Sequence, residues 1–224
     1  MLESLFPESS AVTSYLMGTV TLFLASFTSI ISVANPLAAM PVFLSLTEEN
    51  NPQERATIAK KASFYMFAVL TVFLLGGTYI MNFFGISLSG IRVAGGLIIL
   101  RAAWDMLGPD KRAKLSAEDQ EAAKNKADVS FSPLAMPMLS GPGSIAVVIG
   151  LASQAAGVMD LAVVTAAIVL VALIAYLFLR IAPFSARYIG PSGMSAVTRM
   201  MGFLAMAIAV QFILSGISRF YGLG

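Results

Sequence analysis

Six long apolar stretches divide this chain of 224 residues, at residues 15–46, 62–81, 91–107, 131–154, 161–181 and 197–218. A helix needs about 20 mostly apolar residues to cross a bilayer, and only helices and closed barrels satisfy the backbone there. The composition agrees, because 58% of the residues are hydrophobic and only 12% are charged. The sequence therefore predicts an all-α membrane protein with six transmembrane helices.

A proline motif occurs twice in these stretches, once in the first and once in the fourth. Residues 35–41 read NPLAAMP and residues 137–143 read PMLSGPG, so both copies have two prolines separated by four residues. Proline removes a backbone donor and clashes with the preceding turn. We therefore expect helices 1 and 4 to be broken at membrane depth. Corresponding breaks in two halves of a chain are typical of a transporter binding site.

The halves also share a second pattern, in which an arginine precedes a glycine by three residues. Arg92 and Gly95 lie in the third stretch, and Arg199 and Gly202 lie in the sixth. Three helices per half force the second half to enter the membrane from the opposite side. The prediction is thus two inverted three-helix repeats, at residues 1–110 and 130–224, joined by a cytoplasmic linker at residues 111–129.

The basic residues predict an orientation. Twelve of the 14 lysines and arginines fall in the segments after the first, third and fifth stretches, and only Arg92 and Arg219 fall elsewhere. Basic residues concentrate on the cytoplasmic side of membrane proteins. Both termini are therefore expected outside, and the first stretch, preceded by Glu3 and Glu8, is expected to be a retained helix and not a signal peptide.

The chain contains no cysteine and no histidine. Disulfides, thiolate ligands and imidazole chemistry are excluded, so we expect no metal, haem or other cofactor. An intramembrane hydrolase would need a nucleophile with a base or a pair of embedded aspartates, neither of which is visible. An enzyme is not expected, and the net charge of +2 is read as a topology signal and not as nucleic-acid binding.

The motifs together resemble the MarC family of inner-membrane proteins. The resemblance rests on residues 35–44 (NPLAAMPVFL), 90–96 (GIRVAGG), 133–137 (PLAMP), 141–143 (GPG) and 199–204 (RMMGFL), and it runs nearly end to end. It implies a cytoplasmic-membrane transporter of small neutral amino acids such as glycine and alanine. It also implies coupling to an ion gradient, H+ or Na+.

The broken helices supply the candidate substrate-binding residues. Unwound backbone at membrane depth must line a cavity or meet protein, and a small zwitterion could satisfy both the amino end of one half-helix and the carbonyl end of another. Asn35 adds an amide and Ser140 a hydroxyl, and the small residues leave room only for a small substrate. The candidates are Asn35, Pro36, Ala38, Ala39, Pro41, Ser140, Gly141, Pro142 and Gly143.

Other readings of these residues stay open. Asn35 before Pro36 is also a good helix cap, and proline kinks also serve helix packing. The supporting candidates are Arg92, Gly95, Arg199, Gly202 and Gln211. The two arginines either extend to headgroups or hold freed carbonyls, the glycines suit close helix packing, and the glutamine suits either the site or a bond to a neighbouring helix.

Two further classes compete with a transporter. A channel could use the same broken helices with a continuous pore, and a membrane scaffold or regulator could keep the fold without any flux. No carboxylate is visible in the middle of a span, so the sequence does not name the coupling ion. It also leaves open the exact substrate, the direction of flux and the oligomeric state.

Overall fold

The computed structural model describes the backbone of residues 7–108 and 130–222, and every regular element in these two ranges is a helix. The predicted linker at residues 111–129 lies outside the described residues. The elements are α1 (Pro7–Ala34), α2 (Pro36–Leu46), α3 (Pro52–Phe84), α4 (Leu88–Leu107), η2 (Ser130–Leu139), α6 (Pro142–Ala152) and α7 (Val158–Phe220).

The helix ends follow from local sequence. Asn51 caps α3 in a capping box with Glu54, with Pro52 in the first turn, and Gly85 ends the helix at a φ of 65°. This positive φ favours glycine because it has no Cβ. Ser87 then caps α4 by accepting a hydrogen bond from the amide of Gly90 at 3.0 Å.

Helix α7 is two helices joined at a sharp corner. Gly190 has a φ of 70° and a ψ of 172° inside an otherwise continuous helix, a backbone conformation almost restricted to glycine. The corner divides α7 into Val158–Gly190 and Ser192–Phe220, which are both long and apolar enough to cross a membrane. The fifth and sixth predicted stretches are therefore separate helices.

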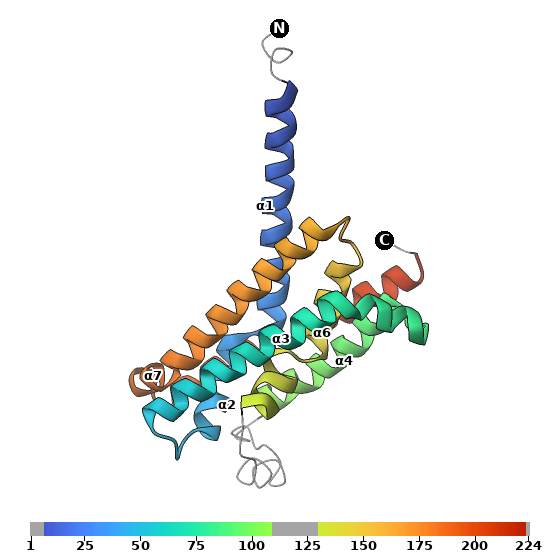
Figure 1. Cartoon of the computed structure of the whole chain (residues 1–224). Coiled ribbons are helices and arrows are strands. Elements are labelled where there is room, and N and C mark those ends of the chain that lie inside the picture. The colour runs from blue at the N-terminus through green and yellow to red at the C-terminus, as the bar shows by residue number, and fades with distance from the viewer. Residues whose placement is uncertain (1–6, 109–129, 223–224) are drawn as a thin grey trace.

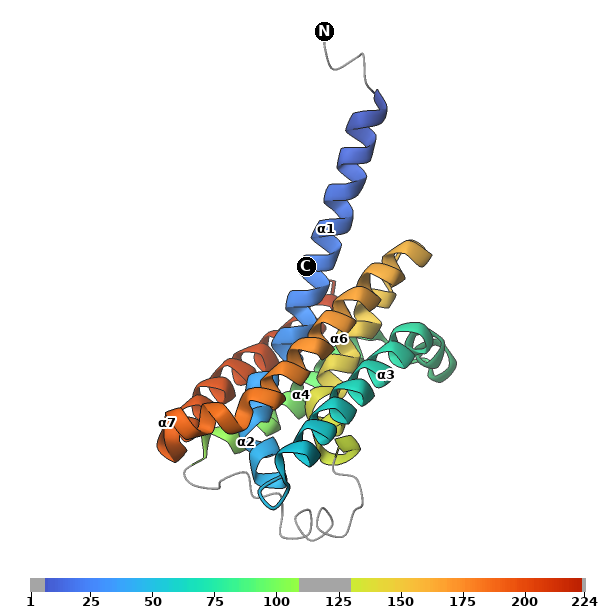
Figure 2. The same ribbon diagram turned by 60° about the vertical axis from the view of Figure 1, so that its left-hand side comes forward.

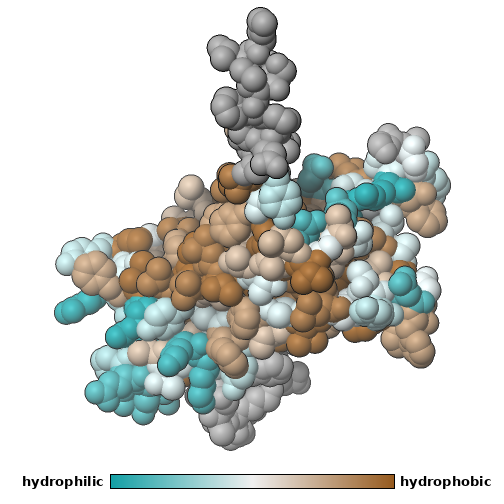
Figure 3. Space-filling view, turned by 45° about the horizontal axis from the view of Figure 1, so that its top comes forward, coloured by the Kyte–Doolittle hydropathy of each residue, from teal (hydrophilic) through white to brown (hydrophobic). Residues whose placement is uncertain are grey.

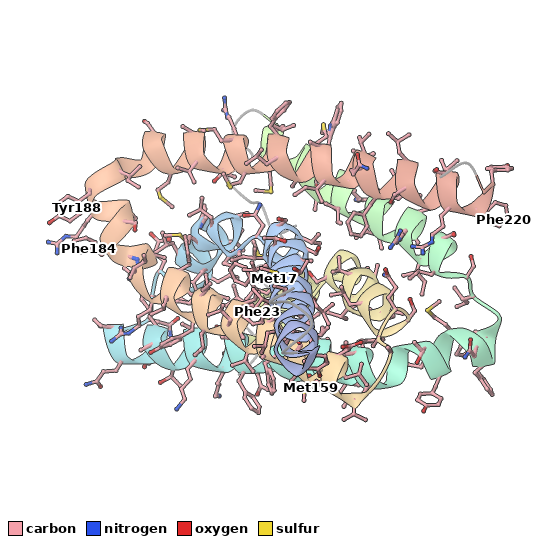
Figure 4. The ribbon with its side chains drawn as sticks, turned by 90° about the horizontal axis from the view of Figure 1, so that it is seen from above. Met17, Phe23, Met159, Phe184, Tyr188 and Phe220 are labelled. Carbon is pink, nitrogen blue, oxygen red and sulfur yellow. The ribbon has the colours of Figure 1, made fainter. Side chains whose placement is uncertain are left out.

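The helices form three layers (Figure 4). The second half of α7 runs beside α4 on one side, and α3 runs beside the first half of α7 on the other. The pairs α1–α2 and η2–α6 lie between them, because α6 contacts both α3 and α4, and α1 and α2 both contact α7. The amino-terminal half of α1 projects away from the bundle (Figures 1 and 2).

Within residues 7–108 and 130–222, four helical segments meet the length and hydropathy requirements of a membrane span: Tyr15–Leu44, Pro52–Phe84, Val158–Gly190 and Ser192–Phe220. The other two predicted spans are less uniform. Helix α4 carries Arg92, Arg101 and Asp105 within 20 residues, and the fourth stretch is divided into two short helices. An apolar band separates hydrophilic regions on the face shown in Figure 3. The all-helical membrane fold is confirmed, while the six-span inverted repeat stays a prediction.

Small residues hold α4 against the second half of α7. A Cβ on Gly216 would lie 2.9 Å from the carbonyl oxygen of Ser89, and a Cβ on Gly96 would lie 2.9 Å from that of Ala209. A Cβ on Gly202 would lie 3.2 Å from the carbonyl oxygen of Ala103. The three pairs recur every seventh residue along both helices, so the two backbones approach closely over their length.

Candidate functional site

The first break occurs at a single residue, Asn35. It adopts a φ of 40° and a ψ of 67° between α1 and α2, and asparagine is one of the few residues that tolerates this left-handed region. Its side-chain oxygen accepts a hydrogen bond from the amide of Ala38 at 3.3 Å. Asn35 therefore caps α2. Because Pro36 has no N–H, the carbonyl of Ser32 loses its regular helical donor.

The second break has a different local structure. The chain enters it through η2, a π-helix of ten residues, a winding that is rare and concentrated at functional sites. Ser140 ends this segment by donating hydrogen bonds to the carbonyl of Ala135 from both its amide, at 2.8 Å, and its hydroxyl, at 2.7 Å. Gly141 then adopts an extended conformation before Pro142 begins α6.

The two breaks differ in how the following half-helix is capped. Asn35 caps α2 with its side chain, whereas Gly141 gives α6 no side-chain cap. The first amides of a helix have no partner within it and carry the positive end of the helix dipole. The start of α6, at Gly143 and Ser144, is therefore the better anion site of the two.

The breaks lie beside each other in the middle layer. A Cβ on Gly143 would lie 2.9 Å from Cγ1 of Val33 and 2.7 Å from Cγ1 of Ile99. A Cβ on Gly95 would lie 3.4 Å from both the Cα of Gly143 and the carbonyl oxygen of Pro142. The carbonyl end of α1 thus packs on the amino end of α6, and α4 covers the junction.

The junction is closed in this conformation. Ala39 and Ser144 are 1% exposed, and Ser140 is fully buried. Ser144 also donates a hydrogen bond from its hydroxyl to the carbonyl of Leu139, at 3.3 Å. The side chains of Val33 and Ile99 fill the space beside Gly143, so a substrate would have to displace them. The junction is therefore filled by side chains of the chain itself.

Most of the predicted binding residues lie in or next to this junction. Pro36, Ala38, Gly141 and Gly143 are buried, while Asn35, Pro41 and Pro142 are partly buried. Asn35, Pro36, Ser140, Gly141, Pro142 and Gly143 form the breaks themselves, and Ala38, Ala39 and Pro41 continue along α2.

The supporting candidates lie in different parts of the structure. Gly95 reaches the junction, but Gly202 packs on α4. Arg199 and Gln211 are exposed on the second half of α7. Arg92 approaches Gly150 near the far end of α6. Among the described residues, neither Arg92 nor Arg199 makes a hydrogen bond, so the structure gives no support to the alternative in which they hold freed carbonyls.

Three contributors to the junction were missed from the sequence: Val33, Ile99 and Ser144. The two aliphatic residues are indistinguishable by type from lipid-facing ones, and only the contacts identify them. Ser144 comes directly after the proline motif at residues 137–143, so its polarity within an apolar run was an available signal. The prolines at positions 133 and 137, four residues apart, were the signal for abnormal winding in η2.

The fold and the broken helices define an integral membrane protein. The chain belongs to the MarC family of integral membrane proteins, whose family model matches residues 20–221. It is 41% identical over 195 residues to the UPF0056 membrane protein of Methanocaldococcus jannaschii, covering 87% of this chain and 95% of the relative.

Two bacterial relatives match over similar lengths. The UPF0056 inner membrane protein MarC of Escherichia coli is 38% identical, covering 84% of this chain and 90% of the relative. The UPF0056 membrane protein YvbG of Bacillus subtilis is 35% identical, covering 85% and 92%. No solved structure matches the chain.

Proposed function

We propose that this protein is a secondary transporter of small neutral amino acids, such as glycine and alanine. It would act in the cytoplasmic membrane by alternating access, driven by a gradient of H+ or Na+. The inner-membrane location is that of the related Escherichia coli protein, as its name states. The amino-acid specificity rests on the resemblance of the sequence motifs to the MarC family.

One observation carries the proposal: the carbonyl end of α1 meets the uncapped amino end of α6 at Val33 and Gly143. A zwitterionic amino acid has a carboxylate that suits the amino end of a helix and an ammonium group that suits a carbonyl end. The carbonyl end of α1 and the amino end of α6 would both lie within reach of one small molecule. This complementarity supports an amino acid over an ion of one sign.

The lining supports a small side chain on the substrate. Most of the candidate residues at the two breaks are alanine, glycine, proline or serine, with Val33 and Ile99 packed beside them, and the junction is buried between two layers of helices. Any substrate would have to displace Val33 and Ile99, and a small side chain needs the least displacement. Rocking of the layers about the junction would expose it to each side in turn, as in other carriers with broken helices.

The test is uptake of radiolabelled glycine and alanine into proteoliposomes, with and without a pH or sodium gradient. We expect saturable uptake that a gradient stimulates, and loss of this uptake in Ser144→Leu, which would fill the start of α6. Asn82→Ala is the matched control because Asn82 is exposed at the end of α3. Linear uptake without saturation would indicate a channel, and no uptake by folded protein would contradict the proposal.

A further inference from the structure

A cavity of about 190 Å³ lies between the start of α3 and the first half of α7, apart from the broken helices. Its lining residues are Pro52, Arg55 and Ala56 of α3 and Leu179, Arg180, Pro183 and Phe184 of α7. Two arginines thus share one small space whose other walls are apolar. Three exposed glutamates in the same region do not line it: Glu48, Glu49 and Glu54.

Arg55 is already fixed by the turn between α2 and α3. Its Nε donates a hydrogen bond to the carbonyl of Thr47 at 2.8 Å, and one terminal nitrogen donates another to the carbonyl of Glu48 at 2.9 Å. A guanidinium has five N–H groups, so three remain for a ligand. Since the side chain is held before a ligand arrives, little further side-chain entropy is lost on binding.

Arg180 is the second donor of the cavity, and it is exposed. It makes no hydrogen bond or ion pair with a residue in the described ranges. The first amides of α3 are not available as donors, because those of Gln53 and Glu54 bond the side chain of Asn51. The two arginines therefore supply the unused donors at this cavity.

The cavity lies at the level of the lipid headgroups. Residues 62–84 of α3 and 161–179 of α7 contain no charged side chain, and charges begin at Lys61 on one helix and at Arg180 on the other. The cavity thus joins the ends of two apolar runs. Exposed Phe184 and Tyr188, with ring centroids 4.6 Å apart, project outward at this end of the bundle (Figure 4). Aromatic residues gather where hydrocarbon meets headgroups.

We propose that Arg55 and Arg180 bind the phosphate group of an anionic lipid headgroup in this cavity. Arginine matches phosphate because its guanidinium donates two parallel hydrogen bonds. Free inorganic phosphate offers the same oxygens, but the apolar lining from Leu179, Pro183 and Phe184 suits the glycerol and first acyl carbons of a lipid. The cavity is smaller than the roughly 300–1,000 Å³ of drug-sized ligand sites, which suits a headgroup.

The predicted orientation supports an anionic lipid. The basic residues place the segments after the first and fifth apolar stretches in the cytoplasm, and this cavity lies between those two segments. The cytoplasmic leaflet carries a negative surface potential from its anionic lipids. Basic pockets between transmembrane helices on that side bind such headgroups in other proteins.

The experiment measures binding of phosphatidylglycerol and phosphatidylcholine to the full chain in detergent by native mass spectrometry. Arg180→Gln removes one donor, and Ala56→Leu fills the cavity while both arginines stay. Arg55 is left unchanged because it also holds the turn after α2. Arg187→Gln is the matched control, because Arg187 is an exposed arginine of the same helix, seven residues further on, and does not line the cavity.

We expect the unchanged chain to prefer phosphatidylglycerol, and Arg180→Gln to weaken its binding about tenfold. Ala56→Leu should also weaken this binding, and Arg187→Gln should bind normally. Equal binding of phosphatidylglycerol by the unchanged chain and by folded Arg180→Gln overturns the proposal. An equal loss in Arg187→Gln, or normal binding by Ala56→Leu, also overturns it, because either result assigns the effect to surface charge outside the cavity.

A second arm separates the two sources of phosphate. In delipidated protein, inorganic phosphate is compared with chloride at equal ionic strength by the shift in thermal unfolding temperature. No stabilisation by inorganic phosphate, together with specific binding of phosphatidylglycerol, supports the lipid. Stabilisation that Arg180→Gln removes, without a preference for phosphatidylglycerol, overturns the lipid assignment in favour of the free anion. None of these readouts depends on transport.

Discussion

Val33 packs directly on Gly143, although the two residues belong to different halves of the chain. Val33 lies two residues before the break at Asn35, and Gly143 lies two residues after Gly141. Since a Cβ on Gly143 would lie 2.9 Å from Cγ1 of Val33, the two breaks cannot separate or approach without changing this contact. Any movement of one half relative to the other must therefore change the contact between Val33 and Gly143.

The junction should therefore respond to added volume at Gly143. We expect Gly143→Ala to lower the free energy of unfolding by about 1–3 kcal/mol, because the new methyl group meets Ile99 and Val33. Adding Ile99→Ala should restore part of this loss, since the contact at 2.7 Å is with the side chain of Ile99. A double-mutant cycle of thermal unfolding in detergent measures the coupling. Additive effects would show that the two residues do not share this space.

Two substitutions test separately the two proposed roles of Asn35, helix cap and substrate ligand. Asn35→Ala removes the cap and strains a position at φ 40°, so it should destabilise the protein by about 1–2 kcal/mol. Asn35→Gly keeps the conformation and should be nearly as stable as the unchanged chain. Uptake assays then decide between the roles. Normal transport by Asn35→Gly indicates a cap alone, and loss of transport in a stable protein indicates contact with the substrate.

The interface between α4 and the second half of α7 should tolerate no added side chain. A Cβ on Gly96 would lie 2.9 Å from a backbone oxygen of Ala209, which cannot rotate away. Gly96→Ala should therefore destabilise the protein by about 1–3 kcal/mol. Gly76→Ala is the matched control, because no atom lies within 4 Å of its added Cβ, and alanine is the better helix former. Similar melting temperatures for the two variants would contradict the close backbone approach.

The predicted orientation can be tested in a chain that has no cysteine of its own. Glu49→Cys lies in the turn between α2 and α3, and Gly222→Cys follows α7. With both termini outside, a membrane-impermeant maleimide should label Gly222→Cys in intact cells. It should label Glu49→Cys only after permeabilisation. The opposite pattern would reverse the orientation that the basic residues predict.

The sequence was sufficient for the helical class and for the places where two helices break, because proline acts through local chemistry. It predicted that helices 1 and 4 break around Pro36 and around residues 141–143, and the structure interrupts them at Asn35 and at residues 140–141. The π-helical winding before Ser140 was not predicted, although Pro133 and Pro137 each remove a backbone donor there. The contact between Val33 and Gly143 could not be predicted from the sequence either, because a contact between distant apolar residues leaves no local pattern.

The seven-residue repeat of small residues between α4 and α7 has a consequence for the order of assembly. Helix α4 leaves the ribosome long before residues 202–216, which cover Ser89, Gly96 and Ala103. During synthesis, the first half therefore enters the membrane with one face of α4 still open to lipid. Its stable packing depends on a helix that is made about a hundred residues later. The two halves are one unit in biogenesis, and neither is a finished module when it is inserted.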